Sequence, residues 1–476
     1  MAFRFLIDLQ AAQNNSKTRG IGRYSTALAK GIVRNAGRHQ VFCLLSDRFP
    51  GTVEEVTSAF AELLAPQHFL IISIPGPVSE QDVANSWRRR TSELLREYMI
   101  HTLAPDATLV LSICEGIADE TVTSVGRLTS EIPTASIIYD LIPLKDSEKY
   151  FPRASDREWY QRKLSELCNS DRLFAISDAT MRDAIEILKY DSERIISISA
   201  AADSVFLPPE SSKINTQAIR QKYGLTRAFV MHASALDERK NFEGLIQAYS
   251  KLPSHIRKAN QLVLVCGLDP VGHARLHEAA SRFGVEADEL VLTGHVPDSD
   301  LSALYAECKL FVFPSFSEGF GLPPLEAMSC GAATIGSNIE SVSQVINLED
   351  ALFDPKSTDS MSAAILRALT DDAFFRQLKA NAIRQSGKFS WDNTARRAIS
   401  GLEQMVRDQD QSADSGKNRS WKRHNFLKHV GEASRGVQLD DSELLNLARA
   451  IEVNDLAIER IQASEAWRLA RKIPHE

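Results

Sequence analysis

Two glutamates eight positions apart, Glu318 and Glu326, share a short stretch with two glycines and two prolines. A carboxylate suits a vicinal diol, because each of its oxygens can accept a proton from one hydroxyl group. The residues from 319 to 324 are too broken for one continuous helix, so the two carboxylates would address different parts of one ligand. The spacing also allows a plainer interpretation, in which Glu318 caps a helix and Glu326 is a solvated charge in its first turn.

The elements around these glutamates predict an anion site. The apolar run 310–313 is typical of a buried parallel strand. Gly319 and Gly321 let the backbone approach a ligand or take a positive φ, and Pro323 and Pro324 suit the first turn of a helix. The N–H groups and the positive dipole end at a helix start favour phosphate. A diphosphate held between two diol-binding carboxylates would be a nucleotide sugar.

Two cations are expected at the same edge of the sheet. Arg239 and Lys240 follow the apolar run 228–233 at a helix entrance. The carboxyl ends of parallel strands share one edge, so these side chains would lie near the glutamate loop. Cations placed there would neutralise a departing diphosphate.

A second glycine-bearing loop lies near the N-terminus. Gly20 and Gly22 precede a helical pattern and have Arg23 beside them. A dinucleotide fingerprint is excluded, because the preceding strand ends near Leu9 and Ser25 stands at the third glycine position. The loop is either part of a ligand site at the carboxyl edge of the sheet or a solvated basic loop.

The stretch 317–328 resembles the E-x7-E signature of retaining glycosyltransferases of family 4, which have the GT-B fold. Further blocks at 237–241, 292–305 and 331–335 resemble the same family in the same order. The resemblance implies an α/β protein with two Rossmann-like doubly wound domains facing across a cleft. It also implies transfer of a sugar from a nucleotide diphosphate sugar to an acceptor hydroxyl, without cofactor or metal.

The resemblance assigns roles to individual positions of this sequence. Tyr139 stands where many members carry a histidine, so either Asp140 makes the polar contact or the family histidine is not a general base. Ser234 stands where an arginine is frequent, which makes Arg239 the candidate substitute. Asp140 also suits a turn or helix cap. The implied catalytic residues are Glu318, Lys240, Arg239 and Asp140; the donor-binding residues are Glu326, Gly319, Phe320, Gly321, Leu322, His295, Val296, Gly20 and Gly22; the acceptor side has Arg23 and Tyr139.

The motifs at 8–10, 19–24 and 139–143 look most like those of bacterial mannosyltransferases of O-antigen or related polysaccharide assembly. This resemblance implies GDP-mannose as donor and a growing polysaccharide or lipid-linked glycan as acceptor. Rhamnosyl or glucosyl transfer is the alternative within the same fold. A nucleotide-sugar hydrolase or epimerase, and an inactive binding module, are the alternatives from other classes.

The composition of the chain limits its possible partners and its cellular compartment. The sequence has 476 residues and a formal net charge of −7, which argues against nucleic acid as the main partner. Six cysteines without a C-x-x-C pair predict free thiols in a reducing compartment. The chain starts directly with a strand pattern and has no apolar run near the length of a membrane span. We therefore expect a cytoplasmic protein whose membrane contact, at the inner face, is at most peripheral.

The chain divides into five expected parts. They are an N-terminal Rossmann-like acceptor domain (1–207), a C-terminal Rossmann-like nucleotide-sugar domain (208–388), a helix crossing back to the first domain (389–407), a linker (408–418) and a helical extension (419–476). In the first domain, apolar runs predict strands at 3–9, 40–46, 68–74, 107–112, 135–139, 172–176 and 194–199. Prolines near 206–215 predict an interdomain linker.

Two amphipathic segments leave alternatives open. The helical pattern 87–100 carries four arginines beside an apolar stripe, so it either grips anionic lipid or packs on the sheet. Within 440–463, apolar residues recur at steps of three and four with one polar position, Asn454. This seam would associate with a second copy, bind a partner protein, or pack on the enzyme itself.

Overall fold

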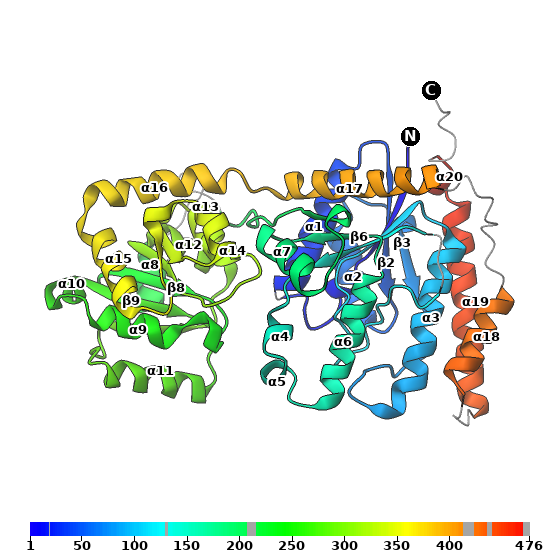
Figure 1. Ribbon diagram of the computed structural model, residues 1–476, viewed down its shortest axis with the longest axis horizontal. Helices are drawn as coiled ribbons and strands as arrows, with labels where there is room; N and C mark the ends of the chain where they lie inside the picture. Colours follow the sequence, from blue (N-terminus) through cyan, green and yellow to red (C-terminus); the bar gives the residue numbers. More distant parts are fainter. Residues whose placement is uncertain (19, 129–131, 207–215, 413–422, 436–439, 470–476) are drawn as a thin grey trace. The chain divides into compact units, whose positions relative to one another are not determined.

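The computed structural model describes residues 1–18, 20–128, 132–206, 216–412, 423–435 and 440–469 (Figure 1). The chain forms two compact units. Unit 1 consists of Met1–Ile176, Thr180–Ile198 and Trp391–Glu476, and unit 2 of Ser177–Ala179 and Ser199–Ser390. The predicted linker near 206–215 lies almost entirely outside the described residues.

Unit 1 contains a seven-stranded sheet in the order β3-β2-β1-β4-β5-β6-β7, and every strand pair in it is parallel. Helices cover the sheet, so its strands are buried runs of apolar residues rather than alternating ones. All seven predicted strands are present, most of them shorter at their ends. The strands are β1 Arg4–Asp8, β2 Gln40–Ser46, β3 Phe69–Ile72, β4 Ala107–Val110, β5 Thr134–Ile138, β6 Arg172–Ala175 and β7 Ile195–Ser197.

Most helices that precede β8 in the chain connect the strands of this sheet. These are α1 Gly20–Asn35, α2 Pro50–Ala59, α3 Ser86–Leu103, α4 Ile142–Lys145, α5 Ser147–Tyr150, α6 Ala154–Cys168 and α7 Asp178–Ile187, with short 3-10 helices at Gln10–Ala12, Pro66–His68, Val83–Asn85 and Ser192–Arg194. The strand order reverses between β1 and β4. The loops after these two strands therefore meet at the switch point of the sheet, where α/β proteins bind ligands.

A long helix, α17 Trp391–Ser412, brings the chain back to unit 1 and packs along α1. The predicted linker at 408–418 is wrong in its first part, because α17 continues through Ser412. Arg172 of β6 holds this end of the helix, with an ion pair to Asp408 at 3.5 Å and a hydrogen bond to Gln404 at 3.1 Å. Polar composition alone does not distinguish the exposed last turn of such a helix from a linker. The rest of the predicted linker lies outside the described residues.

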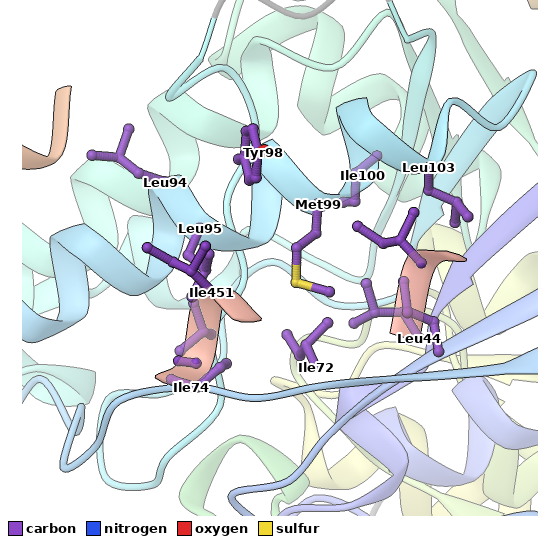
Figure 2. Close-up of a cluster of buried hydrophobic side chains, with 14 of the residues drawn as sticks. Leu44, Ile72, Ile74, Leu94, Leu95, Tyr98, Met99, Ile100, Leu103 and Ile451 are labelled. Atoms are coloured by element: carbon purple, nitrogen blue, oxygen red, sulfur yellow. The ribbon is translucent and has the colours of Figure 1, made fainter. Parts of the chain in front are cut away.

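The C-terminal helices α18 Arg423–Ala433, α19 Asp441–Ala463 and α20 Glu465–Leu469 also belong to unit 1. Leu447, Ile451, Ile458 and Ile461 of the predicted seam are buried in one core with β2, β3 and α3. Figure 2 shows Ile451 among side chains of α3 and of the strand region, including Leu95 and Ile74. The seam therefore packs on its own chain, which was the third of the three alternatives.

The polar position of the seam pairs with the sheet edge. Asn454 is 1% exposed, and its side-chain amide forms two hydrogen bonds with the backbone of Ser73, just beyond the edge strand β3. Its Oδ1 accepts from the Ser73 N–H at 2.7 Å, and its Nδ2 donates to the Ser73 carbonyl at 2.9 Å. A side chain thus satisfies backbone groups that an edge strand would otherwise expose.

The arginine-rich helix α3 packs against α18 and α19 and shares one buried core with β2 and β3, as the second interpretation of this segment predicted. Arg89 and Arg96 are buried, and Arg96 Nε donates to Asp8 at 2.8 Å. Arg88 pairs with Glu443 of α19 at 2.8 Å. In the described part of the chain, no helix is long and apolar enough to cross a bilayer.

Unit 2 contains a six-stranded parallel sheet in the order β10-β9-β8-β11-β12-β13. The strands are β8 Ala228–Ala233, β9 Asn260–Val265, β10 Leu290–Gly294, β11 Leu310–Phe313, β12 Thr334–Ser337 and β13 Leu352–Phe353. The helices are α8 Thr216–Lys222, α9 Phe242–Ser250, α10 Ser254–Ala259, α11 Pro270–Arg282, α12 Asp298–Glu307, α13 Leu322–Ser329, α14 Glu340–Ile346, α15 Thr358–Thr370 and α16 Asp372–Ser386, with 3-10 helices at Glu238–Lys240 and Glu349–Ala351.

Candidate active site

The strand order of unit 2 reverses between β8 and β11. These strands are parallel neighbours, with Leu310 opposite Val230 and Phe311 opposite Met231. Their carboxyl ends therefore lie side by side, and the loops that follow them meet. A backbone bond ties the two loops together, from the Phe316 N–H to the Arg239 carbonyl at 2.7 Å. The predicted cations and the predicted glutamate loop thus converge at the switch point.

Glu318 lies between the two predicted cations. Lys240 Nζ is 2.6 Å from Oε1 of Glu318, and Arg239 Nη1 is 3.2 Å from Oε2. Arg239 Nη1 also donates to the Ser317 carbonyl at 3.2 Å. The side chains of Lys240 and Glu318 are each 8% exposed, so this charge cluster is largely screened from water. The helix-cap interpretation of Glu318 is wrong, because Gly321 occupies the N-cap of α13 with a φ of 109°.

Local sequence explains why the cations lie there. Asp237 Oδ1 accepts the Arg239 N–H at 2.9 Å and so caps the 3-10 turn Glu238–Lys240. Asn241 ends that turn in the left-handed conformation, with a φ of 58°, which asparagine tolerates better than most residues. Its Nδ2 donates to the carbonyls of Pro314 at 3.1 Å and Pro355 at 2.9 Å.

Glu326 is buried, with 7% of its surface exposed, so it is not the solvated charge of the plainer interpretation. The Tyr305 hydroxyl donates to Oε2 of Glu326 at 3.3 Å. Burial, with a smaller contribution from Glu326, raises the pKa of Tyr305 well above its usual range, so the phenol keeps its proton and remains a donor. Glu326 is therefore held in a fixed position on α13.

The start of α13 offers fewer free N–H groups than an ordinary helix. Pro323 and Pro324 carry none, and the Leu325 N–H donates to the Gly321 carbonyl at 3.4 Å. Leu322 is the remaining donor of this first turn. Phosphate binding at this edge would thus depend more on the two cations than on the helix dipole.

The remaining unit 2 positions differ in exposure. Gly319 and Phe320 are buried, and the Phe320 ring lies 5.8 Å from that of Phe389. His295 is exposed and Val296 is buried, both in the loop after β10. The Phe320 side chain thus serves packing, whereas the imidazole of His295 reaches solvent.

The other predicted residues lie in unit 1. Gly20 and Gly22 begin α1, and the Gly22 N–H donates to the Ser16 carbonyl at 3.2 Å. A Cβ atom on Gly22 would lie 2.3 Å from the Ser16 oxygen, whereas a Cβ on Gly20 would meet no atom within 4 Å. Gly22 is therefore required by close backbone contact. Arg23 follows in the same turn and is half-buried.

Tyr139 and Asp140 follow β5. The Tyr139 hydroxyl donates to the Leu111 carbonyl at 2.9 Å and lies 3.1 Å from Ser25 Oγ. Burial raises the pKa of Tyr139 far above neutral pH, so this residue is no proton acceptor. Asp140 Oδ1 accepts the Ile142 N–H at 3.0 Å, which is the turn contact that the sequence allowed.

Residues 215–385 match the family model "Glycosyl transferases group 1" and lie entirely within unit 2. This stretch of unit 2 is thus similar to glycosyltransferases of that group. The chain is also 39% identical over 416 residues to the serotype-specific mannosyltransferase WbdA of Escherichia coli, covering 87% of this chain and 49% of that protein. It is 35% identical over 256 residues to O-antigen chain mannosyltransferase B of Escherichia coli, covering 53% and 65%. The chain spans about half the length of the WbdA relatives.

Solved structures resemble the whole architecture. Sucrose-phosphate synthase from Thermosynechococcus elongatus superposes with a TM-score of 0.62 at 18% identity, covering 85% of this chain and all of that one. WaaG, a glycosyltransferase involved in lipopolysaccharide biosynthesis, superposes with a TM-score of 0.59 at 15% identity, covering 84% and 99%. These likenesses and the two parallel sheets show the GT-B fold, which confirms the predicted fold class.

Sequence reasoning gave no role to Tyr305, described above, or to two further buried polar residues. In unit 2, Asn241 stands in the predicted motif, and an asparagine between a strand and a helix signals a left-handed turn. In unit 1, Glu115 is 5% exposed and accepts from Asn14 Nδ2 at 2.7 Å and Ser112 Oγ at 2.8 Å. Burial raises the pKa of Glu115 to about 7. Glu115 lies just beyond β4, at the switch point of unit 1, and this position in the sequence could have identified it as a candidate site residue.

Proposed function

We propose that this protein is a retaining glycosyltransferase that moves mannose from GDP-mannose to a hydroxyl of a growing bacterial polysaccharide or lipid-linked glycan. The observation that carries the proposal is the cluster of Lys240, Arg239 and Glu318 at the switch point of unit 2, within the stretch similar to group 1 glycosyltransferases. The similarity to proteins named as O-antigen mannosyltransferases supports the choice of mannose.

The charge cluster suggests how the donor would bind. Glu318 is the ion-pair partner of Lys240 and Arg239. A diphosphate carries more negative charge than one carboxylate, so it would replace Glu318 as the partner of both cations. Glu318 would then be free to contact the hexose and stabilise positive charge at the anomeric carbon, while the cations stabilise the leaving diphosphate.

The other predicted residues would complete the site. Glu326, held by Tyr305, would bind the ribose diol through its two oxygens. In this proposal the donor is contacted by the backbone of residues 319–322. The loop with His295 and Val296 borders the base, and Gly20 and Gly22 border the phosphates. Arg23 and Tyr139 line the acceptor side, and Asp140 makes a polar contact near the reacting sugar. Arg239 and Lys240 supply the positive charge, so the proposal includes no metal ion.

We place the reaction in the cytoplasm, at the inner face of the membrane. The six cysteines are all free thiols, and four of them are buried. Buried free thiols are typical of proteins from reducing compartments.

The test is a transfer assay with the full chain. GDP-mannose is incubated with a mannose-terminated oligosaccharide, and the products are analysed by mass spectrometry beside parallel reactions with UDP-glucose and dTDP-rhamnose. We expect the acceptor to gain one or more hexoses from GDP-mannose alone. Lys240→Ala should lower the rate by about a hundredfold or more, the usual range for a lost electrostatic contact in the transition state.

The control is Lys251→Ala, which removes an exposed lysine of unit 2 that pairs with Asp359. It should leave the rate unchanged. Release of free mannose in the absence of acceptor would favour the hydrolase alternative. Failure to consume any donor would favour an inactive binding module, and transfer from dTDP-rhamnose or UDP-glucose instead would replace the proposed sugar.

A further inference from the structure

Helix α19 has a second face, opposite to the one that packs in unit 1. The packed face includes Leu447, Ile451 and Ile458. The opposite face carries Leu445 and Leu456, which are 51% and 56% exposed. In the described part of the chain, α19 carries four exposed large apolar side chains, and no other helix or strand carries more than one. Apolar side chains that gather on one exposed element are typical of an interaction surface.

Six exposed residues form a single stripe along this second face, which we call the outer stripe. They follow one another at steps of three and four positions. An α-helix has about 3.6 residues per turn, so residues at such steps lie on one side of it. The members of the outer stripe are Asp441, Leu445, Arg449, Glu452, Leu456 and Arg460.

The charged side chains of the outer stripe have no partners within the described residues. None of the four forms an ion pair or a side-chain hydrogen bond there. Glu443 of the same helix differs, because it lies outside the stripe and pairs with Arg88 of α3 at 2.8 Å. The charges of the outer stripe are therefore available to a second molecule.

The outer stripe is complementary to itself. Its members form pairs that lie at equal distances on either side of the midpoint between positions 450 and 451, and each pair is either two leucines or two opposite charges. A twofold axis through this midpoint, perpendicular to the helix, would place each member of a pair opposite the other member on a second, antiparallel α19. The pairs are Leu445 with Leu456, Arg449 with Glu452, and Asp441 with Arg460.

The charges also specify the direction of the second helix. In a parallel twofold pair every residue faces its own copy, so Arg449 would face an arginine and Glu452 a glutamate, and both contacts would repel. In the antiparallel pair Arg449 faces Glu452 twice. Glu459, an exposed charge beside the stripe, would then face Ser442, so it adds no contact between like charges.

The leucines and the charges would contribute differently to this pairing. The contacts between Leu445 and Leu456 remove apolar surface from water and supply affinity. Exposed ion pairs add little affinity, but they favour one orientation over another. One helix from each copy makes a small interface, so we expect a weak dimer with a Kd on the order of tens of micromolar.

We infer that the outer stripe of α19 binds the outer stripe of a second copy of this chain, in an antiparallel pair with twofold symmetry. The seam at 440–463 packs inside unit 1, so self-association uses the face opposite to that seam. The observation that carries the inference is the match of leucines and opposite charges about one midpoint.

The test is sedimentation velocity of the full chain, at concentrations from well below to well above about 10 µM. We expect wild type to change from one to two chains per particle as the concentration rises. Arg449→Glu and Glu452→Arg each place like charges opposite one another, so each should weaken self-association at least tenfold. An equimolar mixture of the two variants should associate again, because the two reversed charges face each other and the two unchanged charges do too.

The chain that carries Arg449→Glu and Glu452→Arg together should also associate like wild type. Leu445→Glu should abolish self-association. Leu444→Glu is its matched control, because Leu444 is equally exposed, at 50%, but lies outside the outer stripe. Lys240→Ala should associate like wild type, so failure of the proposed donor site and failure of this interface are distinguishable.

A wild type that remains a single chain per particle at every concentration would overturn the inference. Loss of association in Leu444→Glu equal to that in Leu445→Glu would overturn the choice of face. Thermal melting checks that each variant is folded. Should a single charge reversal unfold the chain, the variant with both reversals decides, and its failure to associate would contradict the antiparallel pairing.

Discussion

Glu318 and Glu326 are both held by partners within the chain. Glu318 pairs with Lys240 and Arg239, and Glu326 accepts from Tyr305. Charged groups that are fixed before binding lose less entropy when the ligand arrives. The affinity of the donor site should therefore respond to changes in the partners as well as in the glutamates.

Tyr305→Phe tests this preorganisation. The variant removes the hydroxyl that donates to Glu326 at 3.3 Å, so the carboxylate loses its fixed position. We expect the Kd for the donor nucleotide to rise several-fold and the free energy of unfolding to fall by about 1 kcal/mol. Fluorescence titration and urea denaturation measure the two effects.

Tyr249→Phe is the control, since its hydroxyl donates to the Asn260 carbonyl at 2.9 Å, at the start of β9. It should lower stability by a similar amount and leave the nucleotide Kd unchanged. An equal rise of the Kd in both variants would show that Tyr305 acts through general stability.

His232 should make unit 2 sensitive to acid. Its Nδ1 lies 3.0 Å from the Val312 carbonyl oxygen, and it must carry the ring proton because a carbonyl oxygen can only accept a hydrogen bond. The unprotonated Nε2 then accepts a hydrogen bond from Ser234 Oγ at 2.8 Å. Burial lowers the pKa of His232 from 6.5 to about 3. At a pH between these two pKa values, His232 is protonated in the unfolded chain and neutral in the folded chain. The contribution of His232 to stability is therefore full above pH 6.5 and is lost as the pH falls toward 3.

For one titrating group, the free energy of unfolding can change by about 1.4 kcal/mol per pH unit. We expect urea denaturation at pH 7 and pH 5 to show a loss of about 2 kcal/mol in the wild type, and a smaller loss in His232→Gln. His255→Gln changes an exposed histidine of α10 and should behave like wild type. Identical acid losses in all three proteins would exclude His232 as the cause.

At the residue scale, the sequence predicted which residues gather but not how they pair. Lys240 and Glu318 were both assigned from motifs, yet their contact spans 78 positions and depends on β8 and β11 being neighbours. The roles of Tyr305 and Asn241 were missed for the same reason. Both act through partners that lie far from them in the sequence.

At the element scale, strand order creates the candidate site. In each sheet the order reverses once, between β1 and β4 in unit 1 and between β8 and β11 in unit 2. The loops that follow these strands carry many of the assigned residues. The apolar runs predicted the strands well, because a parallel strand buried on both faces has a distinctive composition. The end of α17 was not predictable, because its last residues, 408–412, have the polar composition of a linker.

Gly22→Ala tests the loop before α1. Its added Cβ would lie 2.3 Å from the Ser16 oxygen, so the loop must move. We expect the transfer rate to fall at least tenfold and the melting temperature to decrease, both measured on purified full chain. The reason is that a shift of this loop would displace Arg23 and the groups proposed to border the phosphates.

Gly20→Ala is the matched control, because the space around that position is open. Replacing glycine by alanine at a compatible helical position stabilises by about 0.4–1 kcal/mol, so this variant should melt at or above the wild-type temperature. A larger loss of stability in Gly20→Ala than in Gly22→Ala would contradict the packing account.

At the scale of the whole molecule, the C-terminal helices are part of unit 1. Phe426, Leu447 and Ile451 share one core with Leu44 and Ile72 of the sheet. Figure 2 labels Leu44, Ile72 and Ile451 among these residues. The periodicity at 440–463 predicted a buried face, but periodicity does not specify which surface covers it. That information lies in β3 and α3, more than three hundred positions earlier in the chain.

Asn454→Ala should loosen this attachment. It removes both hydrogen bonds to the Ser73 backbone and leaves two part-buried polar groups without partners. We expect a loss of about 1–3 kcal/mol and faster hydrogen exchange throughout α19. Asn446→Ala, an exposed position on the same helix, should leave exchange unchanged. Unchanged protection of α19 in Asn454→Ala would show that apolar packing alone holds the helix.

The most direct test of the central claim is thermal melting of the full chain with GDP, UDP, ADP and dTDP, for wild type, Lys240→Ala and the control Lys251→Ala. A ligand at 100 times its Kd stabilises by about 2.7 kcal/mol. We predict that GDP raises the melting temperature by several degrees in wild type and in Lys251→Ala, and that Lys240→Ala loses this shift. A full GDP shift in Lys240→Ala, or no shift with any nucleotide, would contradict the assignment of the Lys240, Arg239 and Glu318 cluster as a nucleotide-sugar site.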